Sequence, residues 1–252
     1  NNNNNNTTDA TISNSPYDIN EAIANTGKTP LYVACVHGHV EIVKCLLECT
    51  DIDINKARTD VGYNPLHIAC VKGELEIVKL LVKHEKIDVN KVTVKDNRTS
   101  LSIACLKGHV EIVKVLLCLE NNQSNVKVEK GACLVGAVES GNDEILDAFL
   151  GMEGIDVNDG RGEDGKTALF CACENGKLEM LKKLLGVDGI DVNKAKTGGD
   201  GETPLYRACY KENVEIVKLL VEHEAIDVNK AKTDGDGDTP LYRACYKENV
   251  EI

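Results

Sequence analysis

The chain is poor in the side chains that usually build a thick hydrophobic core. Its 252 residues contain no Trp, two Phe and seven Tyr. Leu, Val, Ile, Ala and Cys must therefore fill the interior, and this composition favours thin packed layers. No apolar run approaches the roughly 20 residues that a membrane-spanning helix needs, so we expect no membrane insertion.

The sequence also lacks an excess of positive charge, because its formal net charge is −12. Binding to nucleic acid or to an anionic membrane depends on Lys and Arg that displace counterions. We therefore expect no nucleic-acid partner. The N-terminal stretch NNNNNNTTDATISNSP has neither the basic start nor the apolar core of a signal peptide. We expect an intracellular protein, located in the cytoplasm, with the nucleus left open.

The eleven cysteines do not form a disulfide or metal-binding pattern. Neither Cys45 with Cys49 nor Cys171 with Cys173 has a matching second pair at zinc-site spacing. Six cysteines follow an Ala in a recurring segment, where a thiol packs like a small hydrophobic group. We interpret them as reduced packing residues and expect neither a metal nor a cofactor. The six are Cys35, Cys70, Cys105, Cys173, Cys209 and Cys245.

That recurring segment organises almost the whole chain. TPLYVAC at residues 29–35 returns as NPLHIAC, TSLSIAC, TALFCAC and twice as TPLYRAC, with a weaker copy, ACLVGAV. Successive copies begin 35, 35, 33, 35, 36 and 36 residues apart. Such a constant period is the signature of a repeat architecture. The seven repeats begin at Thr29, Asn64, Thr99, Ala132, Thr167, Thr203 and Thr239.

Each repeat has the same internal plan. A Thr or Asn, often followed by Pro, predicts the start of a first helix, and a Gly nine residues later, such as Gly38, predicts its left-handed end. A second amphipathic helix follows, with Glu41 and Lys44 placed as a surface pair in the first repeat. Then I-D-V-N or I-D-I-N leads into a polar turn rich in Gly and Asp.

These motifs, in this order, resemble those of the ankyrin repeat family. The resemblance implies an all-α repeat solenoid over residues 18–252, with about seven stacked helix-turn-helix units and β-hairpin fingers. Residues 1–17 are expected to be a low-complexity, disordered leader. Family members commonly bind protein partners through the fingers and the concave faces of the first helices. The resemblance therefore implies a non-enzymatic protein-binding scaffold with a protein partner and no small-molecule substrate.

The sequence departs from the family pattern in three places. Glu212 and Glu248 replace the helix-ending Gly, and a left-handed Glu costs about 1 kcal/mol. Residues 119–136 lack both the finger motif and the T-P-L start, which predicts an irregular joint. The last repeat stops within its second helix, so we expect the chain to be part of a longer repeat protein. An alternative function follows: the repeats could be the regulatory or substrate-recruiting arm of a larger enzyme or channel.

Residues 160–167, GRGEDGKT, fit the phosphate-binding pattern G-x-x-x-x-G-K-[ST]. That chemistry requires a buried strand before the loop and a helix after it, and only IDVND precedes Gly160. In repeat register, Gly165, Lys166 and Thr167 occupy the finger-to-helix junction. We interpret the motif as a finger with an exposed Lys166.

Other apparent sites lack essential residues. A calcium loop around Asp234, Asp236 and Asp238 would require Gly and Glu where the chain has Thr239 and Cys245. The histidines show no helical zinc pattern and no paired nucleophile, so we assign His39, His67 and His109 structural hydrogen bonds.

Binding is therefore expected on the surface. Arg207, Tyr210 and Lys211 share one helical face, and such residue types are enriched at interfaces. Equally, Tyr and Arg could shield aliphatic core with their rings and stems, and the sequence leaves both readings open. The candidate partner-binding residues are Tyr63, Lys72, Arg98, Lys107, Glu163, Asp164, Lys166, Arg207, Tyr210, Lys211, Arg243, Tyr246 and Lys247.

Overall fold

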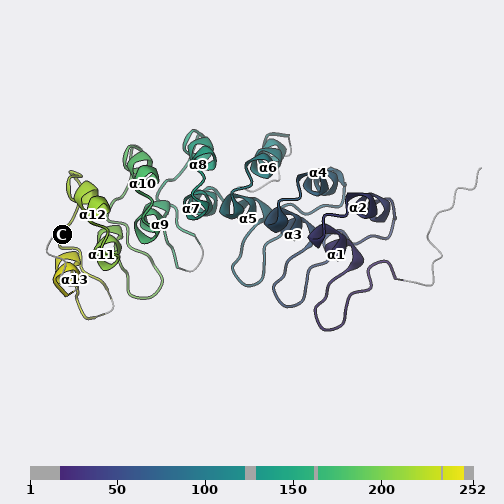
Figure 1. Cartoon of the computed structure of the whole chain (residues 1–252), viewed down its shortest axis with the longest axis horizontal. Coiled ribbons are helices and arrows are strands. Elements are labelled where there is room, and N and C mark those ends of the chain that lie inside the picture. The colour runs from purple at the N-terminus through teal and green to yellow at the C-terminus, as the bar shows by residue number, and fades with distance from the viewer. Residues whose placement is uncertain (1–17, 123–128, 162–163, 234, 247–252) are drawn as a thin grey trace, which may run out of the picture. The chain divides into compact units, whose positions relative to one another are not determined.

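The computed structural model describes residues 18–122, 129–161, 164–233 and 235–246. Several expectations fall outside these residues: those for the leader, Glu163, Lys247, Glu248 and the second helix of the last repeat. The chain forms two compact units that divide between Lys95 and Asp96. All thirteen regular elements of the described residues are helices (Figure 1), as an all-α repeat fold requires.

The first unit contains two helix pairs. In each pair the helices pack against each other, and the first helix of one pair also packs against the first helix of the next. The two second helices are likewise in contact. The helices are α1 (Pro30–Val36), α2 (Val40–Leu47), α3 (Pro65–Lys72) and α4 (Leu75–Lys83).

The second unit continues the same plan with nine described helices. The first helices α5, α7, α9, α11 and α13 form one row, in which each packs against the next, and the second helices form another row (Figure 1). The helices are α5 (Ser100–Lys107), α6 (Val110–Asn122), α7 (Lys130–Ser140), α8 (Asp143–Leu150), α9 (Ala168–Asn175), α10 (Leu178–Leu185), α11 (Pro204–Tyr210), α12 (Val214–Val221) and α13 (Pro240–Tyr246).

The first helices begin where the sequence predicts. The Thr29 side chain accepts a hydrogen bond from the backbone N–H of Tyr32 at 3.1 Å. Asn64 and His67 form a reciprocal capping box, because each side chain accepts from the backbone N–H of the other residue. The other His67 ring nitrogen bonds the carbonyl of Lys91 at 2.8 Å. The predicted structural role of His67 is thus confirmed.

The first helices also end as predicted, in a left-handed residue. Gly38 has a φ of 69°, and the corresponding Gly residues of four later repeats lie between 67° and 77°. Glu212, which replaces this Gly, adopts the same conformation with a φ of 58°. The repeat architecture therefore imposes the left-handed turn even where the residue carries a Cβ atom, at the cost stated above.

The fourth repeat departs from the plan at its first helix. Without a T-P start, α7 begins at Lys130, two residues before the predicted Ala132, and its N-cap residue Glu129 makes no side-chain capping bond. At Gly136 the helix lies so close to α5 that a Cβ atom would stand 2.9 Å from the backbone nitrogen of Leu106. The missing side chain permits this close packing. Of the predicted irregular joint at 119–136, residues 123–128 fall outside the described residues, whereas residues 119–122 belong to α6 and residues 130–136 to α7.

The core is formed by aliphatic side chains and thiols between the helix layers. Seven cysteines are buried, and burial raises the pKa of Cys209 to about 11 and, with Glu74 nearby, that of Cys35 to about 12. These groups stay neutral at physiological pH and pack as hydrophobic side chains, as predicted. Cys245 differs and is exposed, because α13 packs against α11 and against no later helix in the described chain.

The fingers are the segments between one second helix and the next first helix. Several close with a hairpin-like backbone hydrogen bond, such as Arg58 N–H to Tyr63 O at 2.9 Å. Arg161 and Lys166 form an isolated antiparallel bridge. The described residues contain no β-ladder of more than one bridge. Neighbouring fingers are also joined, since the carbonyl of Asp164 accepts from the backbone N–H of Thr197 at 3.0 Å.

The Asn of the I-D-V-N motif links consecutive repeats. Asn193 donates to the carbonyl of Ala225 at 2.7 Å and accepts from the backbone N–H of Asp227 at 2.8 Å. Asn55 makes the equivalent two bonds to Lys86 and Asp88. The motif therefore fixes the spacing between repeats, which the sequence pattern alone indicated only as a turn signal.

Candidate functional site

The fingers extend on the side of the first helices, away from the second helices (Figure 1). This arrangement gives each repeat two different surfaces. We call the surface of the first helices and fingers the finger face and the surface of the second helices the outer face. The two faces differ in how their charges are paired.

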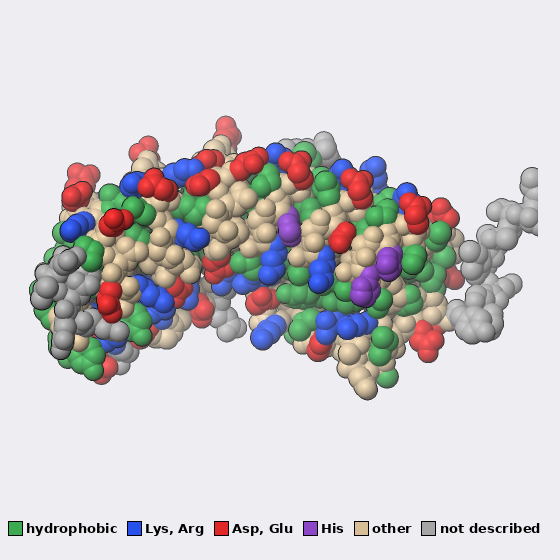
Figure 2. All heavy atoms as spheres, viewed as in Figure 1, with side chains coloured by type: hydrophobic (Ala, Val, Ile, Leu, Met, Phe, Trp, Pro, Cys, Tyr) green, Lys and Arg blue, Asp and Glu red, His purple; other side chains and the backbone are tan. Residues whose placement is uncertain are grey.

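Many charges on the outer face form ion pairs within or between the second helices. Glu and Lys three residues apart form ion pairs on α2, α4, α6 and α10, and Glu41 with Lys44 confirms the predicted pair. Lys183 of α10 also bonds Asp147 of α8 at 2.8 Å. Figure 2 shows acidic and basic side chains intermixed over the second helices. The outer face thus contains many ion pairs between its own residues, although each exposed pair contributes little stability.

The GRGEDGKT segment belongs to the finger face and is not a phosphate loop. Residues 155–159 form a turn without a strand, and the Thr167 side chain caps α9 by accepting from the N–H of Phe170 at 3.2 Å. The ammonium of Lys166 pairs with Glu174 at 2.9 Å and lies over the Phe170 ring. Lys166 is therefore only about one-fifth exposed, which corrects the expectation of an exposed side chain.

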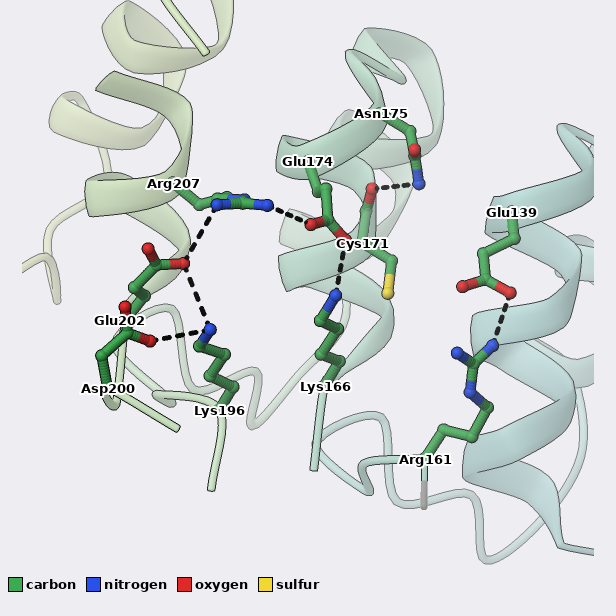
Figure 3. A network of polar contacts seen from close by, with 10 residues as sticks. All are labelled: Glu139, Arg161, Lys166, Cys171, Glu174, Asn175, Lys196, Asp200, Glu202 and Arg207. Carbon is green, nitrogen blue, oxygen red and sulfur yellow. Dashed lines mark hydrogen bonds and ion pairs between the residues drawn. The ribbon is translucent and has the colours of Figure 1, made fainter. Parts of the chain in front are cut away.

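Lys166 is the first member of a chain of ion pairs that crosses the finger face between α9 and α11 (Figure 3). Glu174 on α9 pairs with both Lys166 and Arg207, the latter on α11. Arg207 continues to Glu202 at 3.3 Å. Glu202 approaches Lys196 at 3.5 Å, and Lys196 ends the chain at Asp200, 2.7 Å away. We call these six residues, three cations and three anions, the ion-pair chain.

Pairing in the ion-pair chain favours the charged forms of Glu174 and Lys196. Burial raises the pKa of Glu174, but hydrogen bonds from Lys166 and Arg207 outweigh it and lower that pKa below its usual value. For Lys196, burial opposes the charge, yet the carboxylates of Asp200 and Glu202 raise its pKa. These side chains are mostly removed from water, so their mutual pairing is required to offset desolvation.

A second arrangement continues along the same face from α11 to α13. The Arg207 guanidinium lies over the Tyr210 ring, 5.1 Å from its centroid. Arg243 lies between Tyr210, at 4.3 Å, and Tyr246, at 5.3 Å. Tyr242 stacks on Tyr246 with a centroid separation of 6.4 Å. Arginines and tyrosines thus alternate along this face, and each contact of an arginine with a ring is a cation–π interaction of about 0.5–1 kcal/mol at exposed sites.

The predicted binding residues divide into three groups. Four are half-buried and engaged in contacts with the rest of the chain: Tyr63 beside His67, Arg98 paired with Asp96, Lys166 and Arg207. Arg243 is half-buried between two rings. Those with exposed side chains are Lys72, Lys107, Asp164, Tyr210, Lys211 and Tyr246. Within the second unit, the structure brings together Arg207, Tyr210, Arg243 and Tyr246.

Sequence reasoning missed the acidic half of the ion-pair chain. Glu174 carries no motif of its own, and Glu202 lies in a polar finger turn although its side chain is only 7% exposed. The repeat register contained a signal for these contacts. Glu174 and Tyr210 both stand seven residues after the first-helix cap, and the residue at this position contacts the arginine of the next repeat.

Two further observations concern chemistry. Within the described residues there is no group of three or more His, Cys, Asp or Glu side chains that could hold a metal ion. None of the described helices has the length and apolar character needed to cross a membrane.

Comparisons with known proteins point to one family. A family model described as ankyrin repeats in three copies matches five overlapping segments that together span the chain: residues 1–93, 55–130, 101–196, 134–231 and 182–252. The crystal structure of the human ASB11 ankyrin repeat domain is similar with a TM-score of 0.69 and 27% identity. That match covers 88% of this chain and 95% of the ASB11 chain. A search of curated protein sequences found no match.

Proposed function

Because the chain belongs to the ankyrin repeat family, whose repeats generally act as protein-protein interaction modules, we propose that it is a non-enzymatic scaffold that binds a protein partner through its finger face. The family membership confirms the resemblance indicated by the repeat motifs. The binding face, the partner and the cytoplasmic location are proposals. The alternative, a recruiting arm of a larger enzyme or channel, uses the same binding face.

The exposed aromatic side chains of the finger face support the proposal. On the outer face, lysines such as Lys182 already pair with a carboxylate of their own helix. On the finger face, Tyr210, Lys211 and Tyr246 are exposed, and Lys211 has no ion pair with a described residue. Exposed Tyr side chains are typical of interface hot spots. The finger face is therefore the better surface for a partner.

The proposal can be tested with two matched charge reversals. The partner is first captured on the immobilised chain and identified, and its affinity for the chain is then measured with purified protein. Lys211→Glu on the finger face should weaken binding, while Lys182→Glu on the outer face should not. Both side chains are lysines on helical repeats, so effects of net charge are matched. Equal affinities for the two variants would contradict the assignment of the face.

A further inference from the structure

The most informative feature beyond this proposal is the stack of Tyr210, Arg243 and Tyr246, which we call the Arg243 stack. Arg207 and Arg243 occupy the same position in two repeats of identical local sequence, TPLYRACY. Their surroundings differ because the preceding repeat supplies Glu174 to Arg207 but Tyr210 to Arg243. One arginine is thus neutralised and the other is held between aromatic rings.

No described carboxylate satisfies Arg243. Arg207 pairs with both Glu174 and Glu202, whereas Arg243 makes no ion pair with any residue that the structure describes. The residue equivalent to Glu202 in this repeat is Asp238, and it faces Lys232 at 3.6 Å. The Nε atoms of both arginines are buried without a hydrogen-bond partner. Among the described residues, the two arginines thus share an unpaired Nε atom, and they differ in that only Arg207 forms ion pairs.

The rings hold the Arg243 guanidinium while its own charge stays unneutralised. Tyr210 is 36% exposed and Tyr246 is 67% exposed, so the stack borders solvent. The N–H donors of a guanidinium that lies over a ring point outward around its own edge, where a carboxylate can accept two parallel bonds. Lys211, next to Tyr210, adds an exposed positive charge without an ion pair in the described chain. The two positive charges of Arg243 and Lys211, which are unpaired among the described residues, favour the binding of one anionic group.

We propose that the Arg243 stack binds a single Asp or Glu side chain of an extended segment in the protein partner. This inference rests on the proposed scaffold function and names the chemistry of its partner. The net charge of −12 and the carboxylates of the neighbouring fingers disfavour a polyanion such as RNA. The same carboxylates favour neutral, aromatic or basic residues on either side of the acidic one, and the exposed rings of Tyr242 and Tyr246 offer them a packing surface.

The first test selects short random peptides for binding to the intact 252-residue chain and measures their affinities by fluorescence anisotropy. Selected peptides should share an acidic position, and replacing that residue by its amide should weaken binding roughly tenfold or more, the worth of a hydrogen bond to a charged group. Arg243→Gln should produce a similar loss. The two changes together should cost little more than either alone, because they remove the same contact.

Two variants distinguish a loss of peptide binding at the Arg243 stack from a loss of folding stability. Tyr210→Glu places a carboxylate where Glu174 stands one repeat earlier, so it should neutralise Arg243 internally and abolish peptide binding without unfolding the chain. Arg161→Gln is the control: it removes the partner of Glu139 in an earlier repeat, so it should lower thermal stability and leave the peptide affinity within about threefold.

The outcomes are distinguishable. Peptides that bind with equal affinity to the wild type and to Arg243→Gln would overturn this inference while leaving the scaffold function intact, as would selected peptides without a shared acidic residue. A chain that selects no peptide and captures no protein contradicts the scaffold function and the inference together.

Discussion

Residues 203–210 and 239–246 have the same sequence, TPLYRACY, and both form a first helix that begins at the Pro. Their environments nevertheless differ. Leu205 is 3% exposed and Leu241 is 62% exposed, because α11 packs against α9, α12 and α13, whereas α13 packs against α11. Arg207 enters an ion-pair chain, and Arg243 enters an aromatic stack. In a repeat protein, identical residues acquire their energetic role from the neighbouring repeat.

The largest contrast is expected for the two leucines. Leu205→Ala should lower the free energy of unfolding by about 2–5 kcal/mol, since it leaves a cavity in a filled layer. Leu241→Ala should cost about 0.5 kcal/mol or less, as for an exposed side chain. Urea unfolding of the 252-residue chain measures both. Similar losses would show that α13 is covered as completely as α11.

The thiols of the two helices provide a second contrast. Cys209 is buried and Cys245 is exposed, and burial raises the pKa of Cys209 to about 11. A disulfide reagent should therefore modify Cys245 at least roughly a hundredfold faster than Cys209, whose reaction requires local opening. The rates are compared in Cys209→Ala and Cys245→Ala variants by mass spectrometry of the labelled peptides. Rapid labelling of Cys209 would contradict the packing of α11.

The arginines should differ in stability by a smaller amount. Arg207→Gln removes partners from two partly buried carboxylates and should cost about 2 kcal/mol. Arg243→Gln loses stacking and should cost about 0.5–1 kcal/mol. Thermal unfolding at neutral pH compares the variants, and a larger loss for Arg243→Gln would reverse the assignment of the two roles.

The Arg207 effect should also depend on pH. Because pairing lowers the pKa of Glu174 below its ordinary value of 4.5, its contribution is fully present above that value. The contribution is lost as the pH falls through the folded-state pKa. The stability difference between the wild type and Arg207→Gln should therefore shrink below about pH 4.5. A constant difference down to strongly acid pH would indicate that Arg207 stabilises by packing.

The smallest effect is expected at the turn after α11. Glu212→Gly should raise the free energy of unfolding by about 1 kcal/mol, since it removes a left-handed residue with a Cβ atom. The reverse change one repeat earlier, Gly176→Ala, should be destabilising at a φ of 67°. Chemical denaturation of both variants measures the pair. A neutral Glu212→Gly would mean that contacts of the Glu212 side chain compensate for the strain.

The sequence by itself determined the repeat period, the helix caps and the left-handed ends of the first helices. These features depend on local backbone chemistry, so Thr29, Gly38 and even Glu212 behave as their positions in the repeat predict. It also excluded the phosphate loop, because register placed Lys166 at a finger junction.

Only the tertiary structure decided which charged residues are engaged. Lys166 and Arg207 read as exposed recognition residues, yet Glu174 lies between them once α9 and α11 pack side by side. The packing of α11 against α13 likewise places Tyr210 against Arg243, a residue 33 positions later. Such pairings join side chains of different repeats, so they depend on how the helices stack, and a motif read within one repeat contains no information about them.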